Sequence, residues 1–135
     1  MDSKTQIRIA LEAEAVVGIL NLFESGKVDI IASEVLLYEI NRSPNSIRQE
    51  YAHEVLSRAQ TFVMLTEEVA KQAREFDKQG IKPLDALHLA SAEYAQVDYF
   101  CTCDDLLLKK ANGLAGIKIK VVSPVELIEE LEKWI

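Results

Sequence analysis

Three carboxylates in this sequence stand where a metal site would need them. Asp85 lies two residues after Pro83, in the expected first turn of a helix, where free backbone N–H groups favour an anion. Asp104 directly follows an expected strand, and Glu39 lies on an expected helix close to an apolar stripe. Hard cations such as Mg²⁺ or Mn²⁺ take oxygen ligands and keep several waters that a substrate phosphate can replace. Together, the three positions predict one divalent-metal site.

Each acidic residue also has a purely structural interpretation. Asp85 could be a charge that stabilises a helix N-terminus, and Asp104 could be the N-cap of its helix. Asp105 could be a solvated residue of the first turn, and Glu39 a surface residue at a helix edge. The carboxylates lie at the ends of helices and strands that face one edge of a sheet. This joint placement favours the metal interpretation.

Other reactive residue types give weaker patterns. His88 follows Asp85 by three residues, and we interpret it as a packing histidine rather than a ligand or base. We expect His53 to be solvated on a charged helix. Cys101 and Cys103 share one face of a strand without a cluster of Cys or His partners, so we expect buried small hydrophobes rather than a soft-metal site.

The charge balance bears on the class of partner. The chain has 22 acidic and 15 basic residues and a formal net charge of −7. This disfavours a passive nucleic-acid module more than a metal-dependent nuclease, because bound cations reverse the local sign. Four basic residues flank the acidic elements and could line an RNA path, although each could also be a solvated surface charge: Arg42, Lys82, Lys109 and Lys110.

Helices and strands alternate along the chain and would position these residues. Periodicity, caps and breakers predict helices over Thr5–Phe23, Glu34–Asn41, Ser46–Ala59, Thr66 to the residue before Gly80, Leu84–Gln96, Asp104–Ala111 and Ser123–Trp134. Strands are expected over Val28–Ala32, Thr61–Leu65, Asp98–Cys103 and Ile117–Val121. The pattern predicts one α/β domain over residues 1–135, a three-layer α/β/α sandwich with a mostly parallel sheet.

The sequence also carries expectations about location. No apolar run approaches the roughly 20 residues of a membrane span, and the first residues lack the apolar core of a signal peptide. The two cysteines are too close together to staple a fold. We therefore expect a cytoplasmic protein without a membrane partner.

Three segments carry a family resemblance. Residues 80–92 (GIKPLDALHLASA) and 98–105 (DYFCTCDD) resemble the second half of a PIN domain, and 33–40 (SEVLLYEI) resembles that family's segment with its second acidic residue. The resemblance implies a metal-dependent endoribonuclease, often the toxin of a bacterial toxin–antitoxin pair, with RNA as substrate and an antitoxin protein as partner. It implies metal-site and catalytic roles, with Mg²⁺ or Mn²⁺, for Glu39, Asp85 and Asp104. Thr102 and Asp105 would be supporting residues.

The N-terminus departs from the family pattern. PIN domains open with a central strand that ends in an aspartate, and nothing in Met1–Leu11 supplies it. Residues 2–6 resemble the loop after that strand, so Asp2 receives no catalytic role. We interpret the chain as an N-terminally truncated PIN-like domain. The strands beside the missing one would lack a partner, and we expect a second copy of the chain, in a homodimer, to cover that edge.

Two candidate functions, from different classes of protein, fit these observations. The first is a metal-dependent ribonuclease whose activity depends on the missing strand and its aspartate. The second is a non-catalytic module that keeps the fold and binds RNA or a protein partner. A receiver-like phosphoacceptor domain is disfavoured because it would need paired acids after a first strand.

Overall fold

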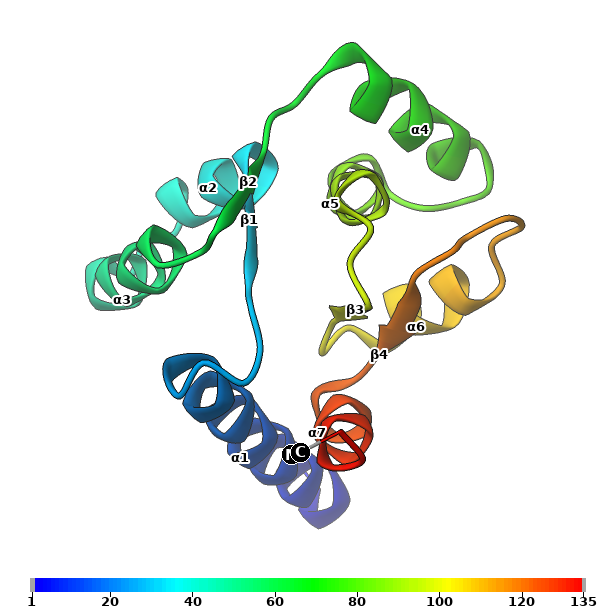
Figure 1. Ribbon diagram of the computed structural model, residues 1–135. Coiled ribbons are helices and arrows are strands. Elements are labelled where there is room, and N and C mark those ends of the chain that lie inside the picture. Colours follow the sequence, from blue (N-terminus) through cyan, green and yellow to red (C-terminus); the bar gives the residue numbers. More distant parts are fainter. Residues whose placement is uncertain (1, 135) are drawn as a thin grey trace.

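A computed structural model describes residues 2–134 and shows helices alternating with short strands (Figure 1). The helices are α1 (Ser3–Glu24), α2 (Glu34–Asn41), α3 (Ser46–Ser57), α4 (Glu67–Lys78), α5 (Pro83–Ala95), α6 (Asp105–Asn112) and α7 (Pro124–Glu132). The strands are β1 (Ile31–Ser33), β2 (Thr61–Val63), β3 (Tyr99–Cys101) and β4 (Lys120–Val122). The predicted order of elements is confirmed.

Side-chain caps explain why most helices begin where they do. Ser33 and Thr66 accept hydrogen bonds from backbone N–H groups in the first turns of α2 and α4. Ser123 and Glu126 form a reciprocal capping box at the start of α7. Helix α5 has no side-chain cap and begins instead with Pro83, whose fixed φ suits the first helical position.

The strands are shorter than the sequence predicts, because side chains take backbone groups that a longer ladder would use. Each strand has three residues. The N–H of Leu65 donates to Glu34 at 2.6 Å just beyond β2. The N–H of Lys118 donates to Glu93 at 2.7 Å, so the alternating segment predicted from Ile117 becomes a strand only at Lys120. The predicted start of that strand is therefore wrong.

The strands form two separate sheets. β1 pairs in parallel with β2, and β3 pairs in parallel with β4. Within residues 2–134 the two pairs are not hydrogen-bonded to each other, and Figure 1 shows them on opposite sides of the centre. The parallel direction within each pair is confirmed. One continuous sheet is not observed.

The buried side chains form two clusters. The larger centres on the packing of α4 against α5 and includes Phe76 and Leu89, which are 1% and 0% exposed. The smaller contains Val122, Leu127 and Leu131 and lies where α1 packs against α7. Helix α1 contributes little to either cluster, because only one of its 22 residues is buried. Several large apolar side chains of α1 are exposed: Ile7, Ile9, Leu11, Val16 and Val17.

None of the helices within residues 2–134 combines the length and the apolar character of a membrane span.

The difference in burial between Leu89 and Leu11 predicts unequal costs for truncating them. Leu89→Ala should lower the free energy of unfolding by about 2–5 kcal/mol, because it leaves a cavity in the α4–α5 core. Leu11→Ala should change it by roughly 0.5 kcal/mol or less, because Leu11 is 52% exposed. Urea denaturation of both variants measures the difference. Equal losses would contradict the placement of Leu89 in a tightly packed core.

Candidate metal centre

Asp85 and Asp104 are brought together at a small hollow. Asp85 is half-buried in the first turn of α5, and Asp104 immediately precedes α6. The hollow has a volume of about 20 Å³, which is close to the space that one water needs. Its lining is Ile81, Lys82, Asp85, Asp104, Leu106, Leu107 and Lys110. Two carboxylates separated by 19 positions in the chain therefore face a space of the size of one water or one small cation.

Hydrogen bonds fix the orientation of Asp104. Its Oδ1 accepts from the N–H groups of Leu106 and Leu107 at 3.0 and 3.1 Å, so Asp104 is the N-cap of α6. Its own N–H donates to Oγ1 of Thr102 at 3.1 Å. Thr102 thus holds the backbone of Asp104 in place, and its role as a supporting residue of a metal site stays a prediction. Within residues 2–134 the second oxygen, Oδ2, has no hydrogen-bond partner and stays available to a cation.

Glu39 lies outside this hollow. Its exposed side chain meets His88 on α5, where Oε2 is 3.2 Å from Nε2. His88 is one helical turn beyond Asp85 and its side chain is 14% exposed, which agrees with a packing histidine that has a polar partner. Within the described part of the chain, no three Asp, Glu, His or Cys side chains form a group that could hold a metal ion.

The carboxylates present fit one type of metal binding. Mg²⁺ is commonly held by one or two carboxylates and keeps most of its waters. Asp85 and Asp104 suit that mode, whereas an ion held mainly by protein oxygens would need Glu39 to approach them. Glu39 follows β1 and Asp104 follows β3, so the separation of the two sheets also separates these acids. A metal role for all three acids stays a prediction.

Asp105 forms an ion pair with Arg8 of α1, across 97 positions of the sequence. Nε of Arg8 also lies 3.4 Å from Oε1 of Glu12. The hydrogen bond and negative charge of Asp105 raise the pKa of Arg8 above its usual value. The sequence gives no signal for this pair, since no periodicity links the first helix to a residue so distant in the chain.

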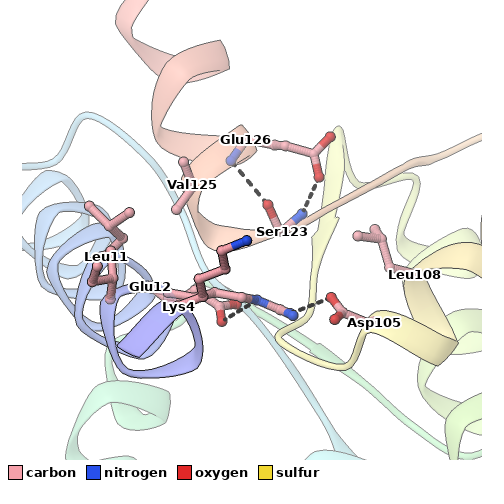
Figure 2. Close-up of a pocket in the computed structure, with 10 residues that line it drawn as sticks. Lys4, Leu11, Glu12, Asp105, Leu108, Ser123, Val125 and Glu126 are labelled. Atoms are coloured by element: carbon pink, nitrogen blue, oxygen red, sulfur yellow. Dashed lines mark hydrogen bonds and ion pairs between the residues drawn. The ribbon is translucent and has the colours of Figure 1, made fainter. Parts of the chain in front are cut away.

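The Arg8 pair borders a second, larger cavity of about 390 Å³ between α1, α6 and α7. Figure 2 shows Lys4, Glu12, Asp105 and Glu126 around this cavity. Leu11, Leu108 and Val125 add apolar side chains. The start of α6 therefore lies between two hollows, because Asp104 lines the small one and Asp105 lines the large one.

The predicted basic residues divide into two groups. Lys82 and Lys110 line the small hollow with the two aspartates. Arg42 instead contacts Tyr38, with its guanidinium 5.4 Å from the ring centroid, and Lys109 is exposed and lines neither hollow. The sequence-based interpretation did not find Lys4 and Arg8, which line the large cavity.

The expectation of buried cysteines is wrong, because Cys101 and Cys103 are both exposed. β3 pairs with β4 along one edge only, and the end of β3 is therefore open to solvent. Desolvation of the thiol nevertheless raises the pKa of Cys101 to about 11, and the nearby Cys103 and Glu12 add to this effect. The pKa of Cys103 is raised as well, mainly by desolvation. Both thiols are therefore neutral near pH 7.

The double role of Asp104 can be separated by substitution. Asp104→Ala should lower the free energy of unfolding by about 1 kcal/mol because it removes the N-cap of α6. Asp104→Asn should cost roughly 0.5 kcal/mol or less because asparagine keeps the acceptor oxygen. Thermal or urea unfolding without added metal measures both. Equal losses in the two variants would contradict the capping role.

The Cys101 thiol predicts a loss of stability in alkali. A thiol with a raised pKa in the folded state favours folding until the unfolded thiol ionises, at about its ordinary value of 9.0. The free energy of unfolding should therefore fall between pH 9 and pH 11, and fall less in Cys101→Ala. Urea unfolding across this pH range compares the two proteins. Parallel curves would show that the thiol of Cys101 does not contribute.

The comparisons with known proteins agree with the sequence motifs. A family model described as PIN domain matches residues 6–113, which is well over half of the chain. The match includes Glu39, Asp85 and Asp104. A comparison with individual curated proteins gave no match.

Proposed function

Because the chain belongs to the PIN domain family, whose fold is nuclease-like, we propose that it cleaves RNA phosphodiester bonds with Mg²⁺ or Mn²⁺ at Asp85 and Asp104. One observation carries the proposal. Two carboxylates from different elements share a water-sized hollow with two lysines, beside the start of a helix. A carboxylate pair recruits a hard cation, and lysines recruit phosphate.

The metal would have a limited protein ligand set. Asp85 and Oδ2 of Asp104 would hold it, and a bound divalent ion would supply charge stabilisation at the phosphate and an activated water. Glu39 would act as a third acid of the site only if α2 and α6 came closer together.

The other residues would orient the acids and the RNA. Thr102 keeps Asp104 in place through the 3.1 Å hydrogen bond, and His88 holds Glu39 against α5. Lys82 and Lys110 lie where a phosphate next to the carboxylates would need positive charge. Arg8 balances Asp105 and thereby limits the repulsion between an RNA backbone and the acidic start of α6.

A non-catalytic role is the second candidate, and the position of Glu39 favours it. The third acid pairs with His88 rather than lining the hollow. In this role the domain would bind RNA or a protein partner, such as an antitoxin. A toxin-type ribonuclease in the cytoplasm, with an antitoxin and as a homodimer, is the fuller form of the first proposal. The toxin role and the antitoxin draw on family resemblance, and the location and the homodimer draw on the sequence pattern.

Calorimetry with Mn²⁺ tests the proposed site. We expect Mn²⁺ binding that weakens at least about tenfold in Asp85→Asn and Asp104→Asn, because each removes one of two charged ligands. Asp104→Asn keeps the N-cap, so its loss would not reflect a damaged α6. Asp77→Asn, on the exposed surface of α4, is the matched control and should bind like the unaltered chain.

RNA cleavage separates the two candidate functions. Under the first proposal, purified protein cleaves single-stranded RNA with Mn²⁺, and both chelation and Asp85→Asn abolish cleavage. RNA binding without cleavage would favour the non-catalytic role. Cleavage that survives chelation, or Mn²⁺ binding unchanged in both aspartate variants, would contradict the proposed metal site.

A further inference from the structure

Tyr38 and Arg42 form an exposed aromatic–cation pair on α2. The guanidinium carbon of Arg42 lies 5.4 Å from the centroid of the Tyr38 ring, and Nη1 of Arg42 donates to the Tyr38 hydroxyl at 3.3 Å. Both residues are exposed, Tyr38 to 55%. The two contacts restrict the orientation of the ring and still leave much of it open to solvent. A flat partner can therefore stack on it.

A second arginine–aromatic pair in the chain differs in both respects. The guanidinium carbon of Arg58 lies 5.4 Å from the centroid of the Phe23 ring, but Phe23 is half-buried. Arg58 also pairs with Glu24 at 3.6 Å, so its charge is compensated. Among residues 2–134, no carboxylate lies within 4.0 Å of the Arg42 guanidinium. The Tyr38–Arg42 pair thus combines an open ring with an uncompensated charge.

Two uncompensated arginines lie on either side of the turn between α2 and α3. Three of the five arginines of the chain pair with carboxylates: Arg8, Arg58 and Arg74. The other two, Arg42 and Arg48, are exposed and have no such partner within residues 2–134. The side chain of Gln49 donates to the carbonyls of Ile40 and Asn41 at 3.3 and 3.1 Å, so α3 begins beside the end of α2. In an acidic chain, these arginines give this surface charge that an RNA phosphate needs.

The pair lies beside the acids of the candidate metal centre. Tyr38 directly precedes Glu39 in α2, and Arg42 follows Glu39 by three residues, so the three side chains are neighbours on the helix surface. Glu39 bonds to His88 at 3.2 Å, and His88 lies one turn after Asp85, about 5 Å along α5. An RNA strand with a phosphate at the small hollow would therefore pass close to the pair.

We propose that the Tyr38–Arg42 pair is a stacking site for an unpaired base of single-stranded RNA, next to the proposed metal site. The base would lie on the Tyr38 ring, and Arg42 and Arg48 would contact the adjoining phosphates. The proposal rests on RNA as the ligand of the proposed function and adds how this chain would hold it. Bases of a duplex are already stacked on one another, so single strands should bind more tightly than duplexes.

The surroundings of the pair favour RNA over a protein partner. Tyrosine and arginine that anchor protein interfaces fill well-packed pockets from which water is excluded. Neither the small hollow nor the large cavity is lined by Tyr38 or Arg42. A base needs only one open aromatic face, and a guanidinium contacts a phosphate through two parallel hydrogen bonds. An open ring beside an uncompensated arginine meets both requirements.

Fluorescence anisotropy with a labelled single-stranded oligoadenylate tests the site in EDTA, where metal-dependent cleavage cannot occur. Tyr38→Ala should weaken binding by about tenfold or more, because it removes the stacking surface, and Tyr38→Phe should bind within about twofold of the unaltered chain. Arg42→Gln should lower the slope of log affinity against log salt by about 0.7, the value for one phosphate contact on a single strand. Arg42→Lys should keep that slope. Arg58→Gln is the matched control and should bind like the unaltered chain.

A fluorescent adenine analogue, placed at each position of the oligonucleotide in turn, reports stacking directly. At one position it should lose fluorescence on binding the unaltered chain and keep it with Tyr38→Ala. RNA binding that is absent, or equal in Tyr38→Ala, would overturn the stacking site, and cleavage in Mn²⁺ would still decide the ribonuclease proposal. Binding that depends on Tyr38, without cleavage in Mn²⁺, would support the stacking site and contradict the ribonuclease. Self-association that Tyr38→Ala abolishes, without RNA binding, would assign the pair to a protein interface and overturn the proposal.

Discussion

Backbone groups of a parallel strand need hydrogen-bond partners on both edges unless water reaches them, and this requirement shapes the whole molecule. β1 and β3 satisfy it on one edge only, so the chain forms two small sheets in place of one. Helix α5 becomes the main link between them, because it packs against β1 and β2 and then leads into β3. Its buried Leu89 and Ala90 therefore hold together parts that a continuous sheet would join directly.

The same division determines which acids meet. Asp85 lies on the linking helix and can approach residues of either half. It shares its hollow with Asp104 of the β3–α6 half, while Glu39 of the β1–α2 half reaches only as far as His88. Among residues 2–134 no strand pairing joins the two halves, and α5 meets an acid of each: Asp85 lies beside Asp104, and His88 bonds to Glu39.

Local signals made the elements predictable from the sequence, and long-range contacts limited the rest. Ser33, Thr66 and Pro83 each mark a helix start through chemistry that acts within one turn, so those boundaries were correct to within one residue. The ends of the strands were wrong where distant side chains compete for the backbone, as Glu93 does at Lys118. Local spacing placed Asp104 at a strand end, but its pairing with Asp85 and the salt bridge of its neighbour to α1 depend on tertiary structure.

The charges of the small hollow suggest how its two proposed ligands would depend on each other. Asp85 and Asp104 are matched there by Lys82 and Lys110, so the lining is neutral overall without a ligand. The cap that Asp104 provides to α6 also draws part of its charge toward the helix N-terminus. A divalent cation that enters alone would make the hollow positive, and a phosphate that enters alone would meet two carboxylates. Each ligand therefore removes the electrostatic cost of the other, and in the proposed function metal and RNA would bind more tightly together than separately.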